Sequence, residues 1–232
     1  MKRFRSKFNF LVPPSGRQPL LVRGLLFLIA LTTLDSFAQN PAYEKAMMGL
    51  VTEIQSTRFG STLQPAANKM ERVAATEKTE WLPNYWVAYC YMQDSYVEKD
   101  DDKRDLLLDK ADVFIEKAAK LTQNNDEVEI LRANLANARM AVKPSFRWMT
   151  YGSKVENALE AAKKISPKNP RIALLEAQGI FYTPEMFGGG HEKSKPLFDK
   201  AIAQFATFKP ASAIHPNWGL PTAKWMLLQI KP

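Results

Sequence analysis

The sequence predicts an all-α fold, a solenoid of about four helical hairpins followed by a C-terminal capping helix. Three observations lead to this prediction. Apolar residues recur every three or four positions through nearly all of the chain after residue 38, and no segment alternates as a β-strand does. Similar helix pairs also return at intervals of about 44 residues, a spacing found in helical-repeat proteins.

The first 38 residues are predicted to be a cleaved secretory signal peptide. Lys and Arg residues precede an apolar run of about 11 residues, Gly24 to Leu34, and Ser36-Phe37-Ala38 has small residues at its first and third positions, as a cleavage site requires. The run is too short to cross a bilayer, which takes about 20 apolar residues. We therefore expect a mature domain of residues 39–232 without a membrane span, exported across an inner membrane to the periplasm or the exterior.

Charge and cysteine content exclude some classes of protein. The whole chain has a net charge of +8, but without the predicted leader it holds 26 basic and 23 acidic residues, a net charge of +3. Nucleic-acid binding is therefore not expected. The single cysteine, Cys90, has no partner for an internal disulfide, and its place in an apolar helix predicts a small buried side chain.

Proline, glycine and asparagine divide the mature chain into helices. Asn125 and Pro170 stand where helices should begin. The longest connections within helix pairs are expected around residues 98–103, 143–152 and 183–191. Helices are expected at about 40–59, 62–75, 81–97, 102–121, 126–142, 153–165, 170–182, 192–208 and 218–230.

The second helix of each pair carries a related motif: MERV at Met70, IEKA at Ile115, LEAA at Leu159 and FDKA at Phe198. Leu159, Ala162 and Pro167 combine a large apolar residue, a small residue and a following proline. This motif resembles that of the tetratricopeptide repeat (TPR) family, of the kind found in bacterial cell envelopes. The resemblance covers most of the mature chain. The resemblance implies a solenoid whose first helices line a concave surface. The units depart from the family because they are about ten residues longer than its ~34-residue repeat.

Two surfaces are predicted to bind a partner. The helix 81–97 has more aromatic residues than one buried stripe needs, and on the concave face these could anchor a peptide: Tyr85, Trp86, Tyr91 and Tyr96. Connections of one kind project from one edge of a solenoid, so a second surface is expected at the long-loop edge. Its candidate residues are Tyr96, Asp100, Phe146, Arg147, Trp148, Phe187 and His191.

No motif in the sequence points to catalysis, a cofactor or a metal site. The two histidines, His191 and His215, lack a second histidine at helical spacing. Gly188, Gly189 and Gly190 lack the Lys-Ser/Thr ending of a phosphate loop. They are expected to form a flexible or left-handed connection that lets Phe187 dock beneath the next helix. We therefore expect no enzyme, no bound metal and no cofactor.

The leading interpretation is a non-catalytic scaffold or adaptor of the cell envelope that binds a protein or peptide. The alternative is a small-ligand-binding accessory protein of an envelope transport system, which predicts a closed apolar cavity instead of an open groove. An enzyme would require His191, Glu192 and His215 to converge on a cleft.

Overall fold

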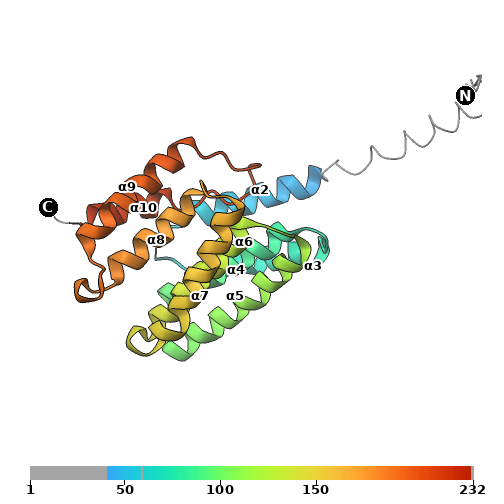
Figure 1. Ribbon diagram of the computed structural model, residues 1–232. Helices are drawn as coiled ribbons and strands as arrows, with labels where there is room; N and C mark the ends of the chain where they lie inside the picture. The colour runs from blue at the N-terminus through green and yellow to red at the C-terminus, as the bar shows by residue number, and fades with distance from the viewer. Residues whose placement is uncertain (1–40, 59, 231–232) are drawn as a thin grey trace, which may run out of the picture. The chain divides into compact units, whose positions relative to one another are not determined.

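The structure is a computed structural model that describes residues 41–58 and 60–230, and every regular element in these ranges is helical (Figure 1). The predicted leader lies outside the described residues and stays a prediction. No helix in the described ranges is long and apolar enough to cross a membrane. The α-helices are α2 (Pro41–Ser56), α3 (Gln64–Thr76), α4 (Trp81–Val97), α5 (Asp101–Leu121), α6 (Asp126–Val142), α7 (Pro144–Ile165), α8 (Pro170–Tyr182), α9 (His191–Thr207) and α10 (Leu220–Leu228), with a short 3-10 turn, η1 (Glu185–Phe187), between α8 and α9.

Side chains with short polar groups start three of these helices, and the starts at Asn125 and Pro170 are ones that the sequence predicts. Asp100 accepts a hydrogen bond from the backbone N–H of Lys103 at the start of α5. Asn125 and Asn169 do the same for the first N–H groups of α6 and α8, and Pro170 is the first residue of α8. Because these N–H groups have no partner within the helix, each cap stabilises its helix by about 1 kcal/mol.

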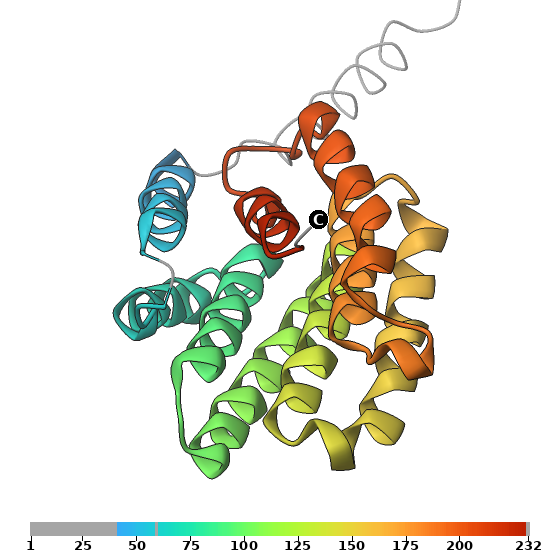
Figure 2. The same cartoon turned by 90° about the vertical axis from the view of Figure 1, so that its left-hand side faces the viewer.

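Three antiparallel hairpins form the body of the protein. The most extensively packed neighbours are α4 with α5, α6 with α7, and α8 with α9, and the first helices α4, α6 and α8 also contact one another in sequence (Figures 1 and 2). Helix α3 packs on α4, and α10 packs on α9. Cys90 is fully buried among apolar neighbours, which confirms the prediction made for it.

Helix α7 begins nine residues earlier than the sequence analysis predicts. Residues 143–152 were expected to form a long loop, but Pro144 is the first residue of α7, and the helix continues through Gly152. Proline is favourable at the first position of a helix, where its missing N–H would have no partner. The prediction was wrong because it used Pro144 only as the end of α6, so Phe146, Arg147 and Trp148 lie on a helix.

Residues 208–219 connect α9 to α10 (Figure 2). Phe208 caps α9, and the non-helical residues 209–219 that follow it bond to α4 and α8. We call residues 209–219 the strap. The indole N–H of Trp86 in α4 donates to the carbonyl oxygen of Ile214 at 2.9 Å, and the indole N–H of Trp218 donates to the hydroxyl of Tyr85 at 2.8 Å. Trp218 was expected in the terminal helix as part of a cap, but it precedes α10 and contacts α4.

Candidate functional site

The predicted concave anchors on α4 are core residues. Tyr85 and Trp86 are completely buried, because the strap covers the face of α4 on which they lie. Tyr91 is also buried: its ring stacks near Phe114 of α5 at 6.3 Å, and its hydroxyl bonds to the Glu71 carboxylate of α3. Tyr85 and Trp86 are therefore closed to a partner while the strap is in place, and Tyr91 is closed by its contacts with α3 and α5.

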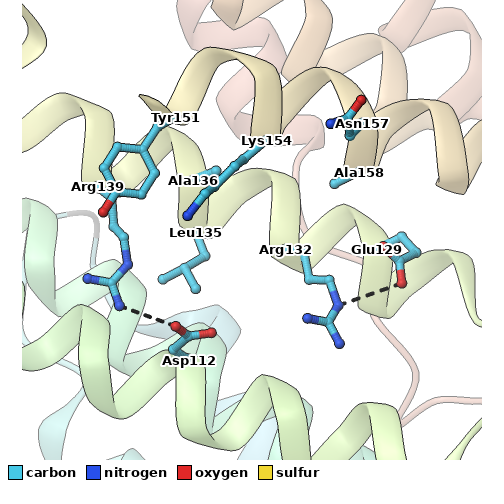
Figure 3. Close-up of a pocket in the computed structure, with 10 residues that line it drawn as sticks. All are labelled: Asp112, Glu129, Arg132, Leu135, Ala136, Arg139, Tyr151, Lys154, Asn157 and Ala158. Atoms are coloured by element: carbon cyan, nitrogen blue, oxygen red, sulfur yellow. Dashed lines mark hydrogen bonds and ion pairs between the residues drawn. The ribbon is translucent and has the colours of Figure 1, made fainter. Parts of the chain in front are cut away.

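A groove of about 400 Å³ lies over α6, between α5 and α7 (Figure 3). Leu135, Ala136 and Ala158 give it an apolar floor, and Tyr151 and Lys154 stand along the α7 wall. Its other lining residues are charged or polar: Asp112, Glu129, Arg132, Arg139 and Asn157.

The arginines of this groove are already neutralised by carboxylates. The Arg139 guanidinium lies 2.9 Å from Asp109 and 3.4 Å from Asp112, both on α5. Arg132 pairs with Glu116 and lies 3.6 Å from Glu129. The groove is therefore a ladder of ion pairs between α5 and α6, which leaves little positive charge for an anion. A second groove, of about 300 Å³, lies beside Lys163 and Glu176 and is also polar. Neither groove is the closed apolar cavity that the small-ligand alternative predicts.

A different surface gathers the exposed apolar side chains. In the stacked hairpins, α4, α6 and α8 end where α5, α7 and α9 begin, so their three connections lie at the same edge of the molecule (Figure 2). Large apolar side chains at this edge are exposed, and we call the set the aromatic edge: Tyr96, Phe146, Trp148, Met149, Tyr182, Met186 and Phe187. Soluble monomers seldom expose so many large apolar groups together unless the surface binds something.

Three further residues were predicted at the long-loop edge, Asp100, Arg147 and His191, and each has a different role in the structure. Asp100 caps α5, as described above. Arg147 is half-buried and makes a two-pronged ion pair with Asp105 of α5, at 2.7 and 2.6 Å. The Arg147 guanidinium therefore holds the pKa of Asp105 below its usual range, mainly through these hydrogen bonds. His191 is exposed and is the first residue of α9.

Tyr96 and Tyr182 stand near the C-terminal ends of α4 and α8. Burial raises the pKa of both phenols, and Tyr182 is a further cause of the rise at Tyr96. Nevertheless Tyr96 keeps 46% of its surface accessible and Tyr182 keeps 70%. Both phenols therefore stay neutral at physiological pH and present partly exposed aromatic faces.

The connection between α8 and α9 has a defined shape. Gly188 and Gly190 have φ angles of 91° and 117°, the left-handed conformation that the sequence predicts. The prediction that Phe187 docks beneath α9 was wrong, because η1 turns this ring outward and 73% of its surface is exposed. We call Tyr182, Met186, Phe187 and His191 together the α8–α9 corner.

Gly189 fixes this corner, and replacing it with alanine should destabilise the fold by about 1–3 kcal/mol. An added Cβ would lie 2.2 Å from the Thr183 carbonyl oxygen and 2.7 Å from that of Ile180, so the backbone would have to move. Urea unfolding of Gly189→Ala measures the loss. Gly152→Ala is the matched control, because nothing lies within 4 Å of its Cβ position in α7 and alanine should stabilise that helix by about 0.5–1 kcal/mol. Equal stabilities for the two variants would contradict the prediction.

Three side chains of the aromatic edge were missed by the sequence analysis: Met149, Tyr182 and Met186. Tyr182 was predicted only as the last residue of a helix, and Met149 was assigned to a loop. Met186 had a usable signal, since a methionine between a proline and three glycines cannot be in a helical core. Among the described residues, no group of three or more His, Cys, Asp or Glu side chains could hold a metal ion. His215 lies in the strap, where it contacts Ser212 and Trp81, whereas His191 stacks on Phe181.

The architecture defines a class, a small all-helical protein built from stacked hairpins with an exposed apolar edge. No family model and no curated protein matches the sequence. The structure is similar to the HusA haemophore from Porphyromonas gingivalis, with a TM-score of 0.73 and 32% sequence identity over 84% of this chain and 96% of that chain. At this identity over nearly the whole length of the haemophore, the protein belongs to the same family as HusA.

Proposed function

We propose that this protein binds haem or a closely related porphyrin outside the cytoplasm, as a ligand carrier of the cell envelope. The observation that carries the proposal is the similarity of this chain to the HusA haemophore, with 32% sequence identity and coverage of 96% of that chain. The proposal corresponds to the alternative drawn from the sequence, a small-ligand-binding accessory protein. The predicted leader at residues 1–38 supports the compartment, and the motifs around Leu159, Ala162 and Pro167 support a TPR-like solenoid as the scaffold.

The aromatic edge is the surface whose chemistry fits such a ligand. A porphyrin is flat and apolar, with carboxylates at one side and, in haem, an iron that takes imidazole, thioether or phenolate ligands. The edge offers aromatic faces and two exposed thioethers, Met149 and Met186, with His191 beside them. The groove over α6 fits less well because charged side chains line its walls.

The protein-scaffold interpretation has less support than the small-ligand one. Its concave anchors Tyr85 and Trp86 are covered by the strap, so a peptide would have to displace eleven residues of the protein's own chain. A protein partner therefore has the aromatic edge as its remaining predicted surface. Such a partner would compete with a porphyrin for the same side chains.

Haemin titrated into the protein of residues 39–232 is expected to give saturable binding at one site, with a shifted Soret band and quenched tryptophan fluorescence. The fluorescence should respond because Trp148 lies on the aromatic edge. Absorbance and fluorescence titrations with haemin and with metal-free protoporphyrin IX are the measurements. Absence of a saturable response to either compound would overturn the proposal.

The location is tested by replacing exposed apolar groups. Met186→Ser combined with Phe187→Ser should weaken haemin binding by about tenfold or more, since one buried apolar side chain is worth about 1.5–3 kcal/mol and 1.4 kcal/mol is tenfold. The matched control is Ile165→Ser, an exposed apolar residue at the C-terminal end of α7, at the opposite edge. Equal weakening by both changes would place the ligand elsewhere.

A further inference from the structure

The edge of the molecule opposite the aromatic edge has a surface chemistry of its own. Helices α5, α7 and α9 end there, and the chain continues into the α5–α6 connection, the α7–α8 connection and the strap (Figure 2). Four lysines at this edge are exposed to water, and we call the set the lysine edge: Lys120, Lys164, Lys168 and Lys209.

Part of the lysine edge repeats with the helix pairs. Lys120 is followed by Leu121 and Lys164 by Ile165, and the two dipeptides are one repeat apart in the sequence. Leu121 keeps 37% of its surface exposed, and Ile165 keeps 40%. Both α5 and α7 therefore end in an ammonium group beside an apolar side chain that is open to water.

The charge of the lysine edge is not cancelled by contacting acids. In the described part of the chain, none of the four lysine side chains makes a hydrogen bond or an ion pair. The carboxylates in the last two turns of α5 and α7 and the first two turns of α6 and α8 are bonded to other groups: Glu116 and Glu129 to Arg132, Asp126 to the Asn169 amide, Glu127 to Arg171, and Glu160 and Glu176 to Lys163.

Two further observations mark the limits of this patch. Contact with Lys163, and to a smaller degree the charge of Lys164, lowers the pKa of Glu160, so Lys164 is near one acid that is paired elsewhere. At the α3–α4 connection, Glu77 and Glu80 flank Lys78 in the sequence, and no excess of positive charge is present. The basic patch therefore belongs to the last two connections and the start of the strap.

Helix stability explains only part of this arrangement. A cation in the last turn of a helix is favourable because helix C-termini carry a partial negative charge, which accounts for Lys120 and Lys164. Lys168 and Lys209 lie outside the helices, beyond the reach of this effect. Nor does helix stability require an exposed apolar residue after each of the first two lysines. The whole set is explained better by an anionic surface that contacts this edge.

The charge at this edge comes from lysine instead of arginine, and this difference indicates the kind of surface. Interfaces between proteins are enriched in arginine, which forms paired hydrogen bonds of fixed geometry, and are depleted in lysine. The arginines near the patch, Arg132 and Arg171, are already paired with carboxylates. Lysine is a hydrated point charge on a flexible stem, so it suits lipid phosphates that have no fixed positions, and neighbouring apolar groups can enter the boundary between head groups and acyl chains.

We propose that the lysine edge docks this protein on a membrane surface rich in anionic lipid. Its ammonium groups face lipid phosphates, and Leu121 and Ile165 enter the head-group boundary. The aromatic edge lies at the other end of the hairpins, so it stays open to its own ligand while the protein is docked (Figure 2). This inference does not depend on haem binding, and each proposal can fail without the other.

The test is cosedimentation of the protein of residues 39–232 with lipid vesicles at about 0.1 M salt, where distant charges are screened. Vesicles of phosphatidylcholine with about 30% phosphatidylglycerol should bind the protein, and vesicles of phosphatidylcholine alone should not. Replacing all four lysines of the lysine edge with glutamine should weaken binding by about tenfold or more, since each lysine near an anionic surface adds about fivefold. The four side chains are exposed, so the variant should fold, and circular dichroism checks this.

The matched control removes the same charge elsewhere by replacing four other exposed lysines with glutamine: Lys45, Lys103, Lys110 and Lys154. This variant should bind the anionic vesicles within about twofold of wild type. Equal weakening in the two variants would overturn the proposal, because net charge alone would then drive binding. Wild-type protein that ignores anionic vesicles, or binds both kinds equally, would also overturn it. If the lysine edge binds poly-L-glutamate but no vesicle, the proposal is overturned in favour of an acidic protein partner.

Discussion

Replacing Arg171 with methionine is expected to lower the free energy of unfolding by about 3–5 kcal/mol, because it leaves a buried carboxylate without its counter-charge. Arg171, in the first turn of α8, is completely buried. Its guanidinium contacts both carboxylate oxygens of Glu127 at 2.7 and 3.0 Å and donates to the Pro216 carbonyl of the strap. It also lies over the ring of Trp218 at 5.5 Å. One side chain therefore joins α6, α8 and the strap.

The loss should depend on pH in a direction that identifies its cause. Burial raises the pKa of Glu127, and the charge of Arg171 opposes this rise. Without Arg171 the pKa of Glu127 in the folded variant lies further above its unfolded value of about 4.3. A raised pKa means that the folded variant prefers the protonated acid, so the penalty is full above the folded pKa and shrinks as the pH falls toward about 4. Urea unfolding at several pH values measures this.

Two variants serve as controls for the buried pair. Lys163→Met breaks pairs with Glu160 and Glu176 that are partly exposed, and should cost less than about 1 kcal/mol. The double variant Arg171→Met/Glu127→Leu removes both charges and should regain part of the loss. A loss for Arg171→Met no larger than that for Lys163→Met would contradict this account.

Local signals in the sequence predicted the helices well. Asn125, Asn169 and Pro170 mark helix starts through interactions that span only a few residues, so a single sequence is enough to read them. Pro144 shows the weakness of such signals. It follows the end of α6 and is also the first residue of α7, and only the end of α6 was predicted from it.

The strap was beyond sequence-based prediction for a physical reason. It has no helical period, and both of its bonds to α4 join residues more than a hundred positions apart, such as Trp86 with Ile214. Because the strap was not predicted, the burial of Tyr85 and Trp86 beneath it was not predicted either, and both residues were assigned to a binding surface. In contrast, the position of Phe146, Trp148 and Phe187 at one edge could be predicted, because the topology of hairpins places their connections together. Their local structure could not: Phe146 and Trp148 lie on α7, and Phe187 is exposed instead of docked beneath α9.

Replacing Trp86 with alanine is expected to lower the free energy of unfolding by about 3–5 kcal/mol, the usual cost of deleting a large buried aromatic side chain. The Trp86 ring packs edge-on against Tyr85 and Tyr89, each with centroids 5.5 Å apart, and its N–H holds the Ile214 carbonyl. The variant should therefore also loosen the strap. Urea unfolding measures the first effect, and hydrogen exchange of the amides in residues 209–219 measures the second.

Trp148→Ala is the matched control, since the same residue type lies on the aromatic edge with 59% of its surface exposed. It should change stability by no more than about 0.5 kcal/mol, as is usual for surface positions. If Trp148 contacts the ligand, this variant should bind haemin more weakly, whereas folded Trp86→Ala protein should keep the wild-type haemin spectrum. The opposite assignment, with Trp86 needed for haemin and dispensable for folding, would show that the ligand displaces the strap. The two tryptophans thus decide whether the concave face of α4 is core, as its contacts indicate, or a binding surface.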